Sequence, residues 1–184
     1  MRKIELYLSL GSNLGNRRFY LEQAIRLLDE AFGIHYKALS SMIETEPWGF
    51  ESTERFINAA VMYELDFPDT FSPEKAGEAI LDICKDIEHS LGRNSGPMYG
   101  KDGSRIYSSR TIDIDILLLG NERIKTERLT VPHGLIKCRD FVMTPLIEVA
   151  SESAINAFPD ISLTRFPEAN SALVVKPPFP SGTN

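Results

Sequence analysis

The sequence contains little cysteine, and this scarcity argues against a disulfide-stabilised scaffold. Only Cys84 and Cys138 occur among the 184 residues, and they do not form a C-x-x-C pair. Small secreted domains that depend on disulfides carry several cysteines, whereas intracellular proteins keep their thiols reduced. We therefore expect two reduced thiols in a cytoplasmic protein.

Long hydrophobic runs and an excess of positive charge are also missing. No segment approaches the roughly 20 consecutive apolar residues of a transmembrane helix, and the first residues lead into an alternating strand instead of a signal peptide. Acidic residues outnumber basic ones by 26 to 20, which gives a net charge of −6. Because nucleic acids and anionic membranes attract basic surfaces, we expect neither as a partner.

The chain is expected to contain one globular domain followed by a tail. A hydrophobic content of 42% is sufficient for a core, and no internal repeat or low-complexity tract occurs before about residue 150. We place the domain at residues 1–150. Residues 151–184 carry several prolines and little pattern, so we expect an irregular C-terminal tail.

Apolar residues recur with periods that predict strands and helices in alternation. Asn16 and Ser72 are suitable N-caps, and Gly33 and Gly92 suit helix ends. The predicted elements are a strand over 4–10, a helix over 17–32, strands over 34–45 and 56–65, a helix over 73–91 and a strand over 110–119. This βαββαβ order predicts an α+β, ferredoxin-like fold: a mainly antiparallel sheet with both helices on one face, and extra C-terminal elements.

Two aspartates, Asp113 and Asp115, lie within the apolar strand over 110–119. Side chains two residues apart point to the same face of a strand, with Cα atoms about 6–7 Å apart. Mg²⁺ prefers oxygen ligands and often joins one or two carboxylates to substrate phosphates. The pair therefore indicates either a magnesium site or the solvated acidic face of a half-buried strand.

Basic residues gather on both sides of this strand. They are Arg93, Lys101, Arg105 and Arg110 in the predicted long loop 93–109 or beside it, and Arg128, His133 and Arg139 after the strand. Guanidinium groups next to a carboxylate pair match the needs of phosphoryl transfer, although a charged loop is also commonly only solvated. Gly11–Gly15 follows a strand and precedes a helix, but it fits no phosphate-loop fingerprint, so we interpret it as a turn.

Asn58 is a polar amide inside an apolar strand, close to Phe56 in sequence. A buried amide must satisfy its donors and acceptors, and an amide flanked by aromatic rings suits recognition of a flat heterocycle. Phe56 and Phe141 are equally consistent with core positions.

Together these segments resemble one enzyme family, 6-hydroxymethyl-7,8-dihydropterin pyrophosphokinase of the folate pathway. The resemblance covers about residues 4–150. Its motifs are Leu10–Gly15, Glu44–Gly49, Phe56–Ala60, Leu91–Arg93, Ser109–Leu117 and Leu129–His133, in the family's order. The family's fold is ferredoxin-like, as the element order also predicts.

The resemblance implies transfer of diphosphate from ATP to the hydroxymethyl oxygen of 6-hydroxymethyl-7,8-dihydropterin, with release of AMP. By position, Asp113 and Asp115 would bind two Mg²⁺ ions, and Arg93 and Arg110 match the catalytic-loop arginines. The implied pterin-binding residues are Thr45, Trp48, Phe56, Asn58 and Phe141. The implied ATP-binding residues are Glu88, Ile116, Arg128, Thr130, His133 and Arg139.

The sequence departs from the family's pattern at a few positions. Asn94-Ser95 stands where a second arginine follows Arg93, and Tyr107 stands where tryptophan is common. Gly134 replaces a frequent tyrosine. These departures leave open a catalytically altered relative that binds ATP or pterin. A ferredoxin-like nucleic-acid-binding module is a further alternative, although the acidic chain lacks the aromatic signature of that class. We expect a monomer or a homodimer.

Overall fold

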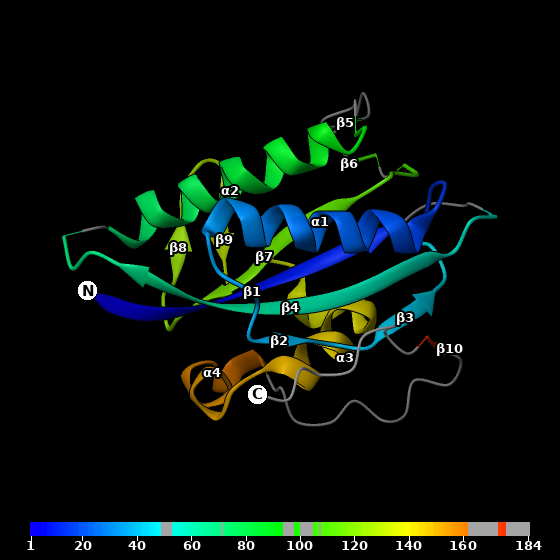
Figure 1. The fold of residues 1–184 in the computed structure, drawn as a ribbon. Coiled ribbons are helices and arrows are strands. Elements are labelled where there is room, and N and C mark those ends of the chain that lie inside the picture. Colours follow the sequence, from blue (N-terminus) through cyan, green and yellow to red (C-terminus); the bar gives the residue numbers. More distant parts are fainter. Residues whose placement is uncertain are drawn as a thin grey trace, which may run out of the picture.

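A mainly antiparallel sheet forms the centre of the molecule (Figure 1). The computed structural model describes residues 1–48, 53–70, 72–93, 98–99, 105–106, 108–161 and 173–175. Its strand order is β10-β3-β4-β1-β7, and the short β2 also pairs with β4. The strands are β1 (Arg2–Ser12), β2 (Ala38–Leu39), β3 (Met42–Thr45), β4 (Phe56–Phe67), β7 (Asp113–Leu119) and β10 (Leu173–Val175).

Two helices, α1 (Arg17–Phe32) and α2 (Pro73–Ser90), cover one face of the sheet (Figure 1). The predicted bounds of α1 are confirmed, and α2 ends one residue earlier than predicted. The side chain of Asn16 accepts a hydrogen bond from the Phe19 N–H, and that of Ser72 accepts one from the Lys75 N–H. Gly33 ends α1 with φ at +68°, a conformation that costs glycine little. The main hydrophobic core lies between these helices and the sheet.

Two further helices, α3 (Asp140–Val149) and α4 (Glu152–Ala157), pack on the opposite face. The strand β1 is therefore buried on both sides: Leu8 belongs to the main core, and Tyr7 belongs to a second apolar cluster beneath α3 and α4. The predicted α+β, ferredoxin-like class with extra C-terminal elements is confirmed.

The expectation that the chain is irregular after residue 150 is wrong for the residues described there. Ser151 caps α4 by accepting a hydrogen bond from the Ala154 N–H, and Phe158 and a 3₁₀ turn (Pro159–Ile161) complete the second apolar cluster. Residues 173–175 form β10, which pairs with β3. The helix was missed because six residues are too few to show a clear helical period.

The predicted strand over 34–45 is divided into β2 and β3. Ser40 causes the break, because its hydroxyl oxygen accepts the Ala60 N–H at 2.8 Å, in place of a main-chain carbonyl. β7 begins at Asp113, three residues later than predicted.

The predicted loop 93–109 contains a short antiparallel pair, β5 (Met98–Tyr99) and β6 (Arg105–Ile106). Lys101, Tyr107, Asn94 and Ser95 lie outside the described residues, and Arg105 is described only by its backbone. After β7, a hairpin of β8 (Ile124–Lys125) and β9 (Thr130–Val131) precedes a 3₁₀ turn (Ile136–Cys138). Within the described ranges, no helix is both long and apolar enough to cross a membrane.

Candidate active site

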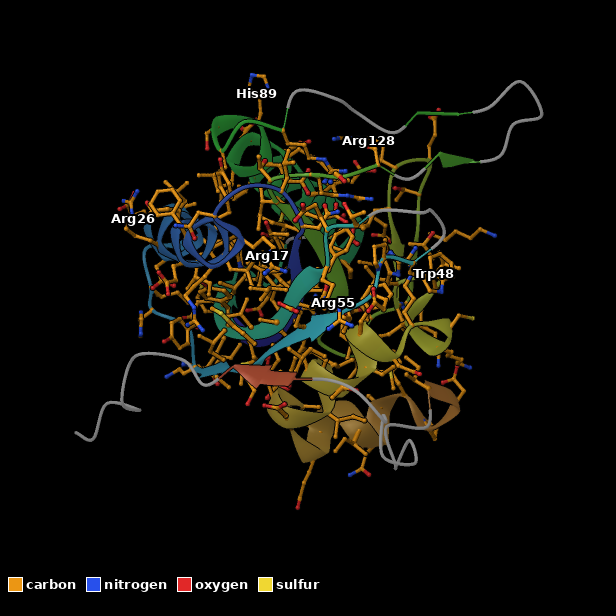
Figure 2. All side chains as sticks on the ribbon, turned by 90° about the vertical axis from the view of Figure 1, so that its right-hand side faces the viewer. Arg17, Arg26, Trp48, Arg55, His89 and Arg128 are labelled. Carbon is orange, nitrogen blue, oxygen red and sulfur yellow. The ribbon has the colours of Figure 1, made fainter. Side chains whose placement is uncertain are left out.

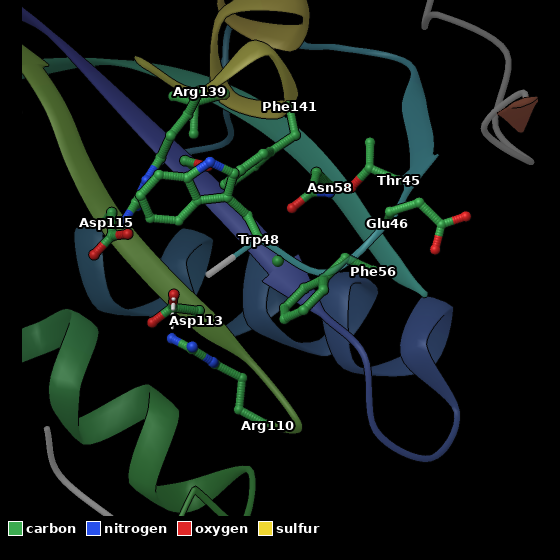
Figure 3. A pocket seen from close by; sticks show the side chains of 13 residues that line it. Thr45, Glu46, Trp48, Phe56, Asn58, Arg110, Asp113, Asp115, Arg139 and Phe141 are labelled. Atoms are coloured by element: carbon green, nitrogen blue, oxygen red, sulfur yellow. Dashed lines mark hydrogen bonds and ion pairs between the residues drawn. The ribbon is translucent and has the colours of Figure 1, made fainter. Parts of the chain in front are cut away.

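A pocket opens on the face of the sheet that carries α3 (Figure 3). The strands β1, β3, β4 and β7 form its floor, and the start of α3 and Trp48 complete it. The lining residues are Ser9, Gly11, Thr45, Glu46, Trp48, Phe56, Asn58, Arg110, Asp113, Asp115, Arg139, Phe141 and Val142. The structure therefore brings the predicted pterin residues, one predicted catalytic arginine and both predicted metal ligands into one site.

Gly11 lies at the centre of the pocket floor. In the antiparallel register it pairs with Asn58 of β4 on one side and with Asp113 of β7 on the other. A Cβ atom at residue 11 would lie only 3.0 Å from Asn58 Oδ1 and 3.7 Å from a ring carbon of Phe56. Glycine here leaves the floor open between the amide and the carboxylate.

The strand period places Asp113 and Asp115 on the pocket face, because Ile112, Ile114 and Ile116 are buried on the helix face. Asp113 is ion-paired with two arginines. One carboxylate oxygen contacts Arg93 Nη1, and the other lies 2.8 Å from Arg110 Nη1. Burial opposes ionisation of this carboxyl, but Arg110 and Arg93 hold the pKa of Asp113 below its usual value.

Glu88 of α2 is buried behind the aspartate strand, with an exposed fraction of 3%. Its Oε1 accepts the Ile114 N–H at 2.7 Å and lies 2.8 Å from Arg93 Nη1, and Lys85 contributes an ion pair at 2.9 Å. Burial raises the pKa of Glu88, and the two cations oppose this effect. Because β7 is the last strand of the described sheet, Glu88 satisfies an N–H that no neighbouring strand reaches.

The opposite side of the pocket is aromatic and amide-rich. Asn58 is 3% exposed, and its Nδ2 donates to Thr45 Oγ1 at 2.8 Å. Figure 3 shows Asn58 and Thr45 on one side and the aspartates with Arg110 on the other, with the Trp48 ring between them in this view.

Arg139 belongs to this aromatic half of the pocket, although the resemblance grouped it with the ATP residues. It is 6% exposed, and its guanidinium carbon lies 4.7 Å from the Trp48 ring centroid and 5.7 Å from that of Phe141. Distances of this size allow cation–π attraction. Arg139 therefore joins the rings of Trp48 and Phe141 into one wall.

The other predicted ATP residues lie outside the pocket lining. The Ile116 side chain is in the main core, so only its backbone remains for a ligand. Arg128 is ion-paired with Asp82 of α2 at the surface, where Figure 2 labels it. Thr130 is exposed on β9. The His133 N–H donates to Leu117 O at 3.0 Å, which places His133 beside β7.

Sequence reasoning missed several residues that shape this site. Arg17 of α1 donates to the Arg55 carbonyl at 2.7 Å and pairs with Glu44 of β3 at 3.1 Å, so it connects β3 with the residue that precedes β4 (Figure 2). Asn13 is fully buried and contacts residues 109 and 110. Gly11 and Ser9 line the floor. Strand alternation predicts that Ser9 and Gly11 share a face, but the sequence does not show what that face meets.

The donor set of the pocket suits Mg²⁺. Two carboxylates project from the same face of one strand, and magnesium commonly takes one or two carboxylates and completes its shell with water and phosphate oxygens. Within the described residues, no group of three or more His, Cys, Asp or Glu side chains is positioned to hold a metal ion.

The ferredoxin-like fold, the carboxylate pair with its arginines and the amide-and-aromatic pocket define a phosphate-transferring enzyme. Residues 7–151 match the family model described as 7,8-dihydro-6-hydroxymethylpterin-pyrophosphokinase (HPPK). The chain belongs to this family. It is thus a pyrophosphokinase that transfers diphosphate in folate biosynthesis.

Named relatives support this membership. A 2-amino-4-hydroxy-6-hydroxymethyldihydropteridine pyrophosphokinase of Bacillus subtilis is 36% identical over 146 residues, which cover 79% of this chain and 78% of the relative. The protein of the same name from Porphyromonas gingivalis is 40% identical over 146 residues, covering 79% of this chain and 90% of the relative.

A solved structure supports the fold. A crystal structure of an HPPK-DHPS in complex with substrates superposes with a TM-score of 0.57 at 13% identity. The match covers 87% of this chain and 43% of that longer chain. At this identity the likeness concerns the fold alone.

Proposed function

We propose that this pocket transfers diphosphate from ATP to the hydroxymethyl oxygen of 6-hydroxymethyl-7,8-dihydropterin. The oxygen attacks the β-phosphorus, the bond from that phosphorus to the α,β-bridging oxygen breaks, AMP leaves, and the hydroxyl proton is released. The observation that carries the proposal is the register at Gly11 of β1, which holds the amide of Asn58 and the carboxylate of Asp113 on the two strands that flank β1.

The pterin would occupy the aromatic half of the pocket. Asn58 and Thr45 already share a hydrogen bond, and together they offer amide and hydroxyl groups to the edge of a flat heterocycle. Phe56 and Phe141 line the same space and would pack against its faces. Trp48, which is 39% exposed, would cover the mouth.

The phosphates would occupy the acidic half. Asp113 and Asp115 would hold Mg²⁺, two ions if the family's pattern applies, which would act as a Lewis acid on phosphate oxygens. Arg93 and Arg110 neutralise Asp113 in the absence of ligand, and the same guanidinium groups are placed to neutralise phosphate charge. Their side chains are only 11% and 10% exposed, and both are held at the aspartate strand by these ion pairs.

The nucleoside would lie along the outer edge of β7. His133 is fixed beside Leu117 of that strand, and Thr130 and Arg128 belong to the neighbouring hairpin and its turn. These residues, with the Ile116 backbone and Arg139, remain our proposed ATP contacts. Glu88 is better explained by its buried contacts with Ile114 and Arg93. We also infer a cytoplasmic enzyme; monomer or homodimer stays a prediction.

Product analysis tests the reaction. Purified protein, ATP, Mg²⁺ and 6-hydroxymethyl-7,8-dihydropterin should yield AMP and pterin diphosphate in equal amounts, separated by chromatography. ADP as the nucleotide product would contradict diphosphate transfer. Nothing in the fold, the site or the relatives favours the altered relative or the nucleic-acid-binding module considered above.

A further inference from the structure

The turn after β1 holds a buried amide that contacts the segment preceding the aspartate strand. Asn13 has an exposed fraction of 0%. Its Oδ1 accepts a hydrogen bond from the Arg110 main-chain N–H at 2.8 Å, and the main-chain N–H of Asn13 donates to the Arg110 carbonyl at 3.2 Å. Asn13 and the Arg110 backbone are thus joined by two hydrogen bonds, one through the side chain and one through the main chain.

The same side chain reaches two further groups. Asn13 Nδ2 donates to Ser109 Oγ at 3.0 Å and, over a longer 3.5 Å, to the carbonyl of Glu54. Ser109 precedes Arg110, and Glu54 lies two residues before Phe56 of the pocket. Asparagine suits this position because its amide both accepts and donates, as a peptide group does. A serine or an aspartate at residue 13 would lack the amide donors.

These contacts continue the sheet beyond its regular end. The last pair between β1 and β7 joins Gly11 to Asp113. Past that pair, the side chain of Asn13 supplies the hydrogen-bond acceptor that the main chain of a further strand residue would provide. Asn13 thereby fixes the backbone of Arg110, which lies three residues before Asp113. Because the Arg110 backbone is fixed, its side chain starts from a defined position. From there the guanidinium donates to Asp113 Oδ2 at 2.8 Å and to the Ser108 carbonyl at 3.1 Å.

We propose that Asn13 is a positioning residue for diphosphate transfer, acting through the backbone of Arg110. Asn13 is not itself among the pocket-lining residues, and of those residues it is hydrogen-bonded to the backbone of Arg110, so its effect on catalysis passes through that arginine. The inference deepens the proposed function and rests on the role given there to Arg110. Catalysis by positioned charges is sensitive to displacements of about 1 Å, which can cost on the order of 100-fold in rate.

A double-mutant cycle tests this route. Asn13→Ala should lower kcat on the order of 10- to 100-fold while the KM for pterin stays within about twofold. In the Arg110→Ala background, the same substitution should change kcat by no more than about twofold, because the residue through which Asn13 acts is already gone. If Asn13→Ala lowered kcat by the same factor in the wild type and in Arg110→Ala, the proposal would be overturned.

Two further variants separate positioning from folding. Ser12→Ala is the matched control: Ser12 is equally buried, its hydroxyl has no hydrogen-bond partner among the described residues, and its rate should equal that of the wild type. Ser109→Ala removes one Asn13 contact from an exposed residue, and should lower kcat less than Asn13→Ala with an unchanged melting temperature.

The outcomes distinguish failure of the role proposed for Arg110 in diphosphate transfer from failure of the positioning role proposed for Asn13. If Asn13→Ala does not fold, Ser109→Ala decides, and a wild-type kcat in that variant overturns the inference. If Arg110→Ala keeps full activity, the role proposed for Arg110 fails and the inference fails with it. If Arg110→Ala is impaired but Asn13→Ala is not, only the positioning role of Asn13 is lost.

Discussion

Asn58 and Asp113 are held on opposite sides of a single residue, Gly11, by the register of three adjacent strands. The amide that suits a heterocycle and the carboxylate that suits a metal-bound phosphate therefore belong to one rigid sheet. Their relative position depends on backbone hydrogen bonds and not on a loop. A hydroxymethyl group on the heterocycle and a diphosphate next to the carboxylates would meet above Gly11.

Filling the floor of the pocket should weaken pterin binding. Gly11→Ala places a methyl group 3.0 Å from Asn58 Oδ1, closer than ordinary contact, and Asn58 is held by Thr45. Overpacking of this kind costs about 1–3 kcal/mol; if that cost falls on pterin binding, the KM for pterin should rise about fivefold or more.

Gly134→Ala is the matched control for this change, because a Cβ there meets nothing within 4 Å. Steady-state kinetics with varied pterin measures both variants. An unchanged pterin KM in Gly11→Ala would exclude the floor as the pterin site.

Loss of one carboxylate should abolish most turnover without unfolding the protein. Asp115→Asn keeps the shape of a half-buried side chain but removes its charge, so kcat should fall at least about 100-fold, as on removal of other preorganised electrostatic groups. The melting temperature should change little.

Asp160→Asn provides the comparison for Asp115→Asn, since Asp160 lies outside the pocket and forms surface ion pairs with Arg123 and Lys137. Turnover by Asp115→Asn within a few-fold of the wild type would remove Asp115 from the proposed metal site.

Replacement of Glu88 distinguishes a structural role from nucleotide binding. Glu88→Gln removes one of the two carboxylates that pair with Arg93 and weakens the contact with the Ile114 N–H. The free energy of unfolding should fall by about 1–3 kcal/mol, and kcat should fall with it, because Arg93 and the aspartate strand shift.

Chemical denaturation and kinetics measure these two effects together, with the exposed Asp86→Asn on the same helix as a control. If Glu88 instead binds ATP directly, Glu88→Gln will raise the KM for ATP while the stability stays at the wild-type value.

The two thiols should differ sharply in reactivity. Burial raises the pKa of Cys84 to about 12, whereas Cys138 is exposed. The thiolate is the reactive form, and it forms only as the pH approaches the thiol pKa, so Cys84 remains protonated at pH 8. One equivalent of thiol should react with a disulfide reagent in the native protein, and two in denaturant. Rapid reaction of two native equivalents would contradict the burial of Cys84.

The sequence was sufficient for features that depend on local period. Alternation located Asp113 and Asp115 on one face, and Asn58 was conspicuous as an amide in an apolar strand. Capping residues and glycines predicted the ends of α1 and α2 to within one or two residues. The family resemblance then implied which residues bind pterin and which bind ATP. Hydrophobic periodicity cannot predict such roles.

The remaining features depend on contacts between distant segments. Asn13 meets residues 96 and 97 positions away, and Glu88 meets Ile114 across 26 positions. Neither contact leaves a trace in local spacing. Ser40 is a similar case, because its hydroxyl replaces a main-chain acceptor opposite Ala60 and breaks a strand that the sequence presents as continuous.

Coupled binding of the two substrates tests the central claim, that one pocket joins a pterin half to a phosphate half. Calorimetry would measure the Kd for pterin with and without Mg²⁺ and a non-hydrolysable ATP analogue, in the wild type and in Asp115→Asn. The account predicts that the analogue tightens pterin binding to the wild type at least about fivefold, that this coupling is reciprocal, and that Asp115→Asn binds pterin alone normally but loses the coupling. Equal pterin affinity with and without the analogue in the wild type would contradict a shared site.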